Sequence, residues 1–116
     1  VDGVGYQQIV SVDRVELDLT PVPVSEADVM SAVVGFMSSG FDVTVQVPVR
    51  ARVFVVAPDE YVLVFVVHHI SADGSSMGPM TRDLMVAYMA RSADAMPSWA
   101  PLAVQYADYA LWQREV

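Results

Sequence analysis

An apolar segment that ends in two histidines places the strongest constraint on how this chain can fold. Tyr61 to Val67 is followed directly by His68 and His69, and the segment is apolar at both odd and even positions. Neighbouring side chains of a strand point to opposite faces of a sheet, so this pattern is typical of a strand covered on both sides. We therefore expect a central strand here. It is too short to cross a bilayer, which takes about 20 apolar residues.

The residues before this segment predict its partner strand. Val49 to Ala57 is rich in β-branched side chains, and Pro58-Asp59-Glu60 has the composition of a turn. We therefore expect a β-hairpin whose return strand runs from Tyr61 to His68.

Helical periodicity predicts three helices. Ser25 is a candidate N-cap for the first, and Gly40 is a candidate stop. Pro79 suits the first turn of the second helix, and a third is expected from about Val104. The apolar residues at helical spacing are Val29, Val33, Phe36 and Met37 in the first helix, and Met77, Met80, Leu84 and Tyr88 in the second.

Two weaker strand candidates precede the first helix, at Gln7 to Val12 and Arg14 to Leu17. Pro21 and Pro23 are expected to break the chain after them. Together with the hairpin and the helices, these strands predict an α/β fold, arranged as an α+β two-layer sandwich. A length of 116 residues suffices for one small domain, and 54% apolar residues suffice for a core.

The charge balance excludes some partners. The chain has 14 acidic residues against 6 arginines and no lysine, for a net charge of −8. Nucleic acids and anionic membranes would repel such a surface, so we expect neither as a partner. The chain has no cysteine, which excludes disulfides and thiolate zinc sites and fits a cytoplasmic protein.

Candidate catalytic residues lie between the apolar strand and the second helix. His68 and His69 open this loop, and Asp73 and Gly74 close it. On a strand the two imidazoles would diverge, so one can face a cleft while the other is bound into the structure. An imidazole can take a proton near neutral pH. Asp73 can cap the helix start, and Gly74 supplies backbone freedom, so both are expected to hold the loop.

Blander interpretations of this loop stay open at this point. A histidine at a strand end is most often structural. A metal site is disfavoured because adjacent histidines on a strand point apart and the chain has no third histidine. A serine nucleophile at Ser71, Ser75 or Ser76 is disfavoured because none of them lies in a Gly-x-Ser-x-Gly elbow.

Three blocks of the chain resemble a known family. Residues 68–74, His-His-Ile-Ser-Ala-Asp-Gly, match the HHxxxDG motif of the condensation-domain and chloramphenicol-acetyltransferase-like superfamily. Residues 106–114 resemble the Y-x-D-[FY]-A-x-W segment of nonribosomal peptide synthetase condensation domains, and residues 48–54 resemble their "PLRARLF" strand. The resemblance implies that residues 1–116 are part of the N-terminal, chloramphenicol-acetyltransferase-like half of a condensation domain, cut at both ends.

The resemblance also implies an activity. Condensation domains join an acyl or peptidyl thioester on an upstream carrier domain to the amine of an aminoacyl thioester on a downstream one. Both substrates ride on phosphopantetheine of partner carrier domains, an adenylation domain belongs to the same synthetase, and the segment itself binds no cofactor or metal. His69 corresponds to the catalytic residue, while His68, Asp73 and Gly74 correspond to residues that hold the loop.

The chain departs from the family pattern in two respects. Ser75 stands where condensation domains often have an aromatic residue after Asp-Gly. The family's arginine that pairs with the motif aspartate would precede Val1, and Arg50 and Arg52 are the nearest, weak substitutes.

Related functions remain as alternatives. They are an epimerisation domain, a free-standing acyltransferase, and a non-catalytic module that keeps the fold and recruits partners. We expect the isolated chain to be inactive and to self-associate, since its apolar strand needs cover.

Overall fold

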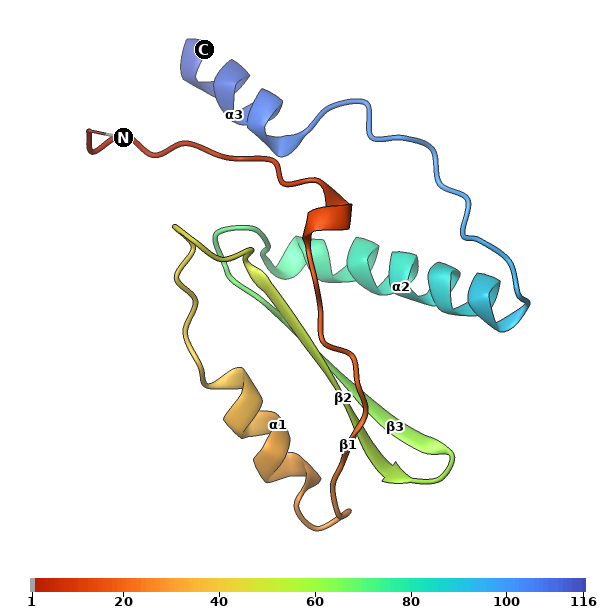
Figure 1. The fold of residues 1–116 in the computed structure, drawn as a ribbon. Helices are drawn as coiled ribbons and strands as arrows, with labels where there is room; N and C mark the ends of the chain where they lie inside the picture. Colours follow the sequence, from red (N-terminus) through yellow and green to blue (C-terminus); the bar gives the residue numbers. More distant parts are fainter. Residues whose placement is uncertain (1) are drawn as a thin grey trace. The chain divides into compact units, whose positions relative to one another are not determined.

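The structure is a computed structural model that describes residues 2–116. It contains two compact units. One is the continuous segment Ser11–Met77, and the other is made of the residues before and after it. Figure 1 traces the elements of both units along the chain.

A three-stranded sheet forms the centre of the unit Ser11–Met77. Its strand order is β1 (Val22–Pro23), β2 (Val49–Ala57) and β3 (Glu60–Val67). β1 pairs parallel to β2, and β2 pairs antiparallel to β3 in a register from Val49 opposite Val67 to Ala57 opposite Glu60. The mixed α/β class predicted from the sequence is therefore confirmed.

The predicted hairpin is confirmed, but the predicted central position of its return strand is wrong. Among residues 2–116, β2 is the middle strand and β3 lies at the edge. Independently of this edge position, one face of β3 is exposed, with relative accessibilities of 58% for Tyr61, 44% for Leu63 and 38% for Phe65. An apolar pattern on both faces shows that a strand can be covered, but it does not show which neighbours cover it.

The two weaker strand predictions are also wrong. Residues 7–12 and 14–17 form no strand, and a short 3-10 helix, η1 (Val12–Arg14), lies across their boundary. The additional strand is instead β1, in the segment where prolines were expected to break the chain. Pro23 is tolerated there because β1 is an edge strand, and the backbone N–H of Val24 resumes pairing with the carbonyl of Val55 at 3.1 Å.

The first predicted helix forms as α1 (Val29–Met37). The prediction of Ser25 as its N-cap is wrong, because the N-cap is Asp28, and the Ser25 Oγ accepts from the backbone N–H of Asp28 at 3.1 Å one turn before the helix. The half-buried face of α1 consists of Val29, Ala32, Val33 and Phe36. Met37 is 54% exposed, so its assignment to the apolar face is wrong.

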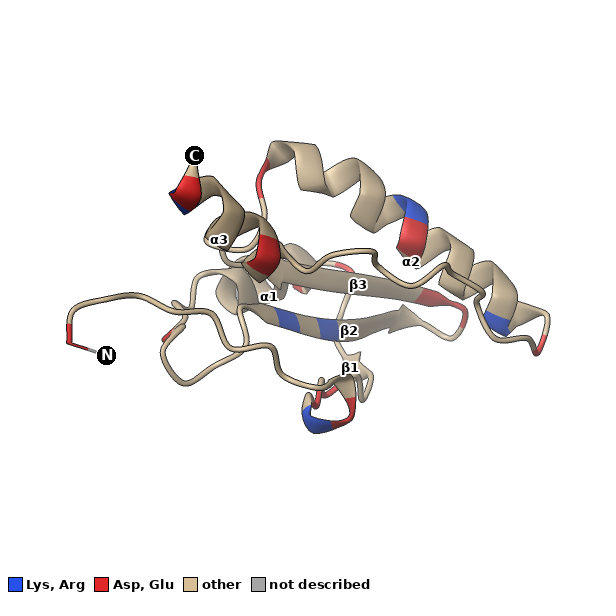
Figure 2. Ribbon diagram, turned by 90° about the horizontal axis from the view of Figure 1, so that it is seen from above, with Lys and Arg blue, Asp and Glu red and all other residues tan. Residues whose placement is uncertain are grey.

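The core is small. Ala51 and Phe54 on β2 and Val64 on β3 are the buried apolar residues of the described chain. Phe54 and Val64 belong to one face of the sheet, which also carries Arg50 and Arg52. The two arginines are the blue bands of β2 in Figure 2.

The remaining two predicted helices also form. α2 (Met77–Ser92) follows a short 3-10 helix, η2 (Gly74–Ser76), and Tyr88 of its predicted apolar stripe is 69% exposed. α3 (Tyr106–Glu115) has Gln105 as its N-cap, and the backbone N–H of Gln105 donates to the Asp108 carboxylate at 2.7 Å. No helix among residues 2–116 combines the length and apolar character needed to span a membrane.

Candidate functional site

The two histidines of the motif lie where β3 ends. The backbone N–H of His68 donates to the carbonyl of Pro48 at 2.9 Å. Hydrogen bonding between the two arms of the hairpin therefore continues one residue beyond Val67, the last residue of β3. A turn follows, closed by the N–H of Ser71 on the carbonyl of His68 at 2.9 Å. The apolar residues before His69 suggested that it continues the strand, but it lies in a turn.

The imidazole of His68 is tied into this turn. Its Nδ1 accepts from the backbone N–H of Ile70 at 2.9 Å. In the neutral ring the proton is then on Nε2. The ring of Phe41 meets the His68 ring in a T-shaped contact, with 5.8 Å between centroids and an interplanar angle of 84°. His68 is half-buried by these neighbours.

His69 has the opposite environment. Its side chain is exposed, and within residues 2–116 it has no hydrogen bond, ion pair or ring contact. One imidazole is therefore bound into the structure and the other is exposed, and that the exposed one faces a cleft stays a prediction. What each does in the function stays a prediction.

Asp73 closes the loop as the N-cap of η2. One carboxylate oxygen accepts from the backbone N–H groups of Ser75 and Ser76, at 3.0 and 3.2 Å, and from their hydroxyls, at 2.6 and 3.2 Å. The Ser76 hydroxyl also accepts from the N–H of Asp73 at 3.1 Å, which completes a capping box. Hydrogen bonds from the side chains of Ser75 and Ser76 hold the pKa of Asp73 below its usual value.

The two serines are site residues that the sequence reasoning did not assign to Asp73. Ser75 stands where the family often has an aromatic residue. Both its N–H and its hydroxyl bind the carboxylate, which an aromatic residue could do only through the backbone. The signal was present in the sequence, since an Asp followed by serines two and three residues later is a local capping pattern.

Gly74 and the two arginines differ from expectation. Gly74 does not adopt a positive φ, and a Cβ built on it would meet nothing within 4 Å, so this backbone does not require glycine there. Arg50 donates to the carbonyls of Ser39 and Gly40, beyond the end of α1, and Arg52 stacks over Phe36. Neither arginine, each named above only as a weak substitute, pairs with Asp73 in the described residues.

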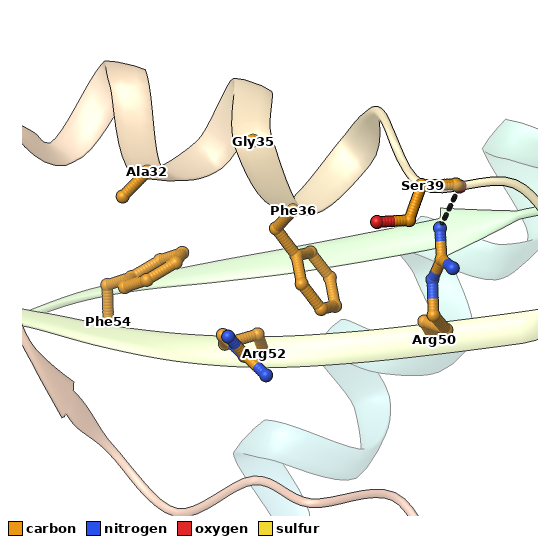
Figure 3. A pocket seen from close by; sticks show the side chains of 7 residues that line it. All are labelled: Ala32, Gly35, Phe36, Ser39, Arg50, Arg52 and Phe54. Atoms are coloured by element: carbon orange, nitrogen blue, oxygen red, sulfur yellow. Dashed lines mark hydrogen bonds between the residues drawn. The ribbon is translucent and has the colours of Figure 1, made fainter.

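A shallow pocket lies between α1 and β2. It has a volume of about 460 Å³. Figure 3 shows Phe36 above the strand and Arg50 reaching the carbonyl of Ser39. The lining residues are Ala32, Gly35, Phe36, Ser39, Arg50, Arg52 and Phe54.

The aromatic block near the C-terminus belongs to the other unit and is organised by helical spacing. The rings of Tyr106 and Tyr109 lie 5.7 Å apart, and those of Tyr109 and Trp112 lie 5.8 Å apart, as neighbours at i and i+3 should. Asp108 of this block caps α3. The block thus builds a helix start and an exposed aromatic face, with Tyr106 and Trp112 at 67% and 58% accessibility.

No group of three or more potential metal ligands is assembled in the part of the chain that the structure describes. The absence of a metal from the function stays a prediction. Asp73 is in any case committed to η2 through its serine partners.

Comparison with known proteins identifies the family. A model of the Condensation domain family matches residues 2–116. The chain is 46% identical over 114 residues to a dimodular nonribosomal peptide synthase of Bacillus subtilis, covering 98% of this chain and 5% of that protein. It is 44% identical over 119 residues to an isonitrile lipopeptide synthase of Mycobacterium tuberculosis, covering 100% of this chain and 5% of that protein. The chain therefore belongs to the condensation domain family of nonribosomal peptide synthetases.

Solved structures agree with this assignment. The X-domain from teicoplanin biosynthesis superposes with a TM-score of 0.79 at 43% identity, covering 84% of this chain and 22% of that one. The same domain in complex with OxyB gives a TM-score of 0.79, covering 21% of that chain. The resemblance seen in the sequence motifs is confirmed at the level of family and fold.

Proposed function

We propose that this chain is the part of a condensation domain that carries the catalytic histidine for amide-bond formation, and that His69 is that residue. The observation that carries the proposal is the contrast within one motif. His69 is exposed and without a partner in residues 2–116, while His68 and Asp73 are hydrogen-bonded into the loop around it. A catalytic imidazole must be free to meet a substrate, and its neighbours must hold it still.

The proposed reaction joins two carrier-bound substrates. The amine of the downstream aminoacyl thioester attacks the carbonyl carbon of the upstream thioester, so that a C–N bond forms and the C–S bond breaks. The amine loses a proton, and the upstream phosphopantetheine leaves as a thiol. The His69 imidazole accepts that proton or orients the amine through a hydrogen bond, and a proton returned to the sulfur balances the step.

The other motif residues act on structure in this proposal. His68 fixes the turn through Ile70, and Asp73 fixes the start of η2 through the two serines. Gly74 belongs to the same cap, although its backbone angles do not demand glycine. The substrates arrive on upstream and downstream carrier domains, an adenylation domain loads them, and the setting is cytoplasmic.

The test uses a complete condensation domain that contains this chain, supplied with loaded carrier domains. We expect His69→Ala to lower the rate of amide product by about 10²–10⁴-fold, the range for a lost general acid–base group. Ser71→Ala is the matched control, because Ser71 is exposed in the same turn and its hydroxyl has no recorded hydrogen bond within residues 2–116. Near wild-type product from His69→Ala would refute the proposal. Loss with Ser71→Ala would revive a serine nucleophile.

A partner-recruiting module is the second candidate function. It is favoured by one observation: a structural relative at 43% identity is an X-domain captured in complex with OxyB. A domain of this kind would give no amide product with any pair of loaded carriers. His69→Ala would leave its binding of a partner protein unchanged. Epimerised product or acylated alcohol in the same assay would instead indicate the epimerisation or free-standing acyltransferase alternatives.

A further inference from the structure

A line of alternating cationic and aromatic side chains ends at the first histidine of the motif. The guanidinium of Arg52 lies 4.8 Å from the Phe36 ring centroid, and that of Arg50 lies 5.7 Å from the same ring. Arg50 also lies 4.1 Å from the Phe41 ring centroid, and Phe41 meets His68 edge-on at 5.8 Å. All five residues belong to the unit Ser11–Met77.

Arg50 is the best-fixed member of this line. Its Nη1 donates to the carbonyl of Gly40 at 2.9 Å, and its Nη2 donates to the carbonyl of Ser39. These carbonyls lie just beyond α1, where the helix dipole favours a positive charge. The Nε of Arg50 is buried with no hydrogen-bond partner in the described residues. The terminal nitrogens and the flanking rings therefore set the position of this guanidinium, which lies over the ring of Phe41.

We propose that Phe41 and Arg50 are positioning residues for the catalytic loop, acting through the orientation of the His68 ring. The proposal rests on the proposed role of His69. The Ile70 N–H needs Nδ1 of His68 as its acceptor, and a ring flip would present a C–H in its place. The Phe41 ring stands against that flip, and Arg50 holds Phe41. Because residues 68 and 70 flank His69, the flip would also release the backbone that carries the exposed imidazole.

The first arm of the test does not need activity. In the complete domain, ¹⁵N NMR of the histidine side chains reports whether Nδ1 of the neutral His68 ring accepts a hydrogen bond, because the Nδ1 chemical shift changes when that bond is lost. Phe41→Leu and Arg50→Lys should each weaken the hydrogen bond from Ile70 and shift the Nδ1 signal of His68, and Phe41→Tyr should leave that signal at its wild-type position. Arg52→Lys is the matched control, since Arg52 lies on the same face of β2 but contacts Phe36 and not Phe41.

The second arm measures turnover with loaded carriers. Phe41→Leu and Arg50→Lys should lower kcat by about tenfold with KM nearly unchanged, because misplacement of a reacting group by about 1 Å can cost up to 10²-fold in rate. Phe41→Tyr and Arg52→Lys should keep the wild-type kcat. If Phe41→Leu does not fold, Arg50→Lys decides the question by the same two readouts.

The outcomes separate this proposal from the proposed function. An unchanged Nδ1 signal of His68 in both Phe41→Leu and Arg50→Lys would overturn the positioning role, whether or not the domain forms amide bonds. An equal kcat loss in Phe41→Leu and Phe41→Tyr would also overturn it, because the ring itself would then not matter. A shifted Nδ1 signal of His68 in these variants of a domain without amide-forming activity would keep the structural link and refute only the proposed reaction.

Discussion

The hairpin and the loop that follows it are stabilised in different ways. The β2–β3 hairpin depends on long-range pairing and on burial of apolar side chains such as Phe54 and Val64. In the loop from His68 to Ser76, the side-chain hydrogen bonds join residues at most three positions apart. The conformation of the motif loop is therefore determined largely by hydrogen bonds within the loop. The stability of the strand before it depends instead on which residues cover the sheet.

The largest expected effect tests the hairpin half of this comparison. Phe54 is 4% exposed on the face of β2 that α1 covers, and it lines the pocket in Figure 3. Phe54→Ala should lower the free energy of unfolding by about 3–5 kcal/mol, through lost burial and the cavity left behind. Denaturant unfolding measures this loss of stability. Tyr61→Ala is the control, because the Tyr61 side chain is 58% exposed. Equal losses in both variants would contradict the assigned core.

The next effect concerns the exposed face of the edge strand. We expect the isolated 116-residue chain to self-associate and to be inactive, because β3 leaves apolar side chains and an unpaired edge open. Leu63→Lys should shift it toward monomer in size-exclusion chromatography with light scattering. Val45→Lys, which makes the same charge change at a 79% exposed site outside the sheet, should not. A monomeric wild-type chain would be evidence against this account of β3.

A smaller effect should appear as a pH dependence of the loop. Hydrogen bonds from Ser75 and Ser76 lower the pKa of Asp73 below its ordinary value of 3.8, so the ionised carboxylate stabilises the folded state. That contribution is fully present above the ordinary value and is lost as the pH falls through the lowered one. The stability of the wild type should therefore approach that of Asp73→Asn as the pH drops below about 4.

The control for this titration is Asp59→Asn in the β2–β3 turn. The Asp59 carboxylate makes no hydrogen bond within residues 2–116. Asp59→Asn therefore removes a negative charge but no capping interaction. Unfolding midpoints from pH 7 to pH 2 give the comparison. A gap between wild type and Asp73→Asn that is constant with pH would contradict the role of the carboxylate.

Most of the correct predictions concern features that depend on neighbouring residues, although two local features were missed: the serine partners of Asp73, and the helix η1 where strands were expected. The other missed features depend on distant residues. The hairpin, the three helices and the available His69 all follow from patterns within a few positions. The edge position of β3 and the strand at Pro23 depend on which segments pair, and a single sequence does not show this. Phe41 precedes the β2–β3 hairpin in the sequence and His68 follows it, so no local pattern could reveal the contact between them.

In the loop that follows β3, His69 is proposed to be free for catalysis, while Asp73 holds the backbone in place. The most direct measurement is the thermal unfolding midpoint of His69→Ala and Asp73→Ala in a complete condensation domain that contains this chain. The account predicts that His69→Ala unfolds at the wild-type temperature, because its side chain has no partner to lose within residues 2–116. Asp73→Ala should unfold at a lower temperature, because the donors of Ser75 and Ser76 lose their acceptor. An unchanged midpoint for Asp73→Ala, or a lower one for His69→Ala, would contradict the account.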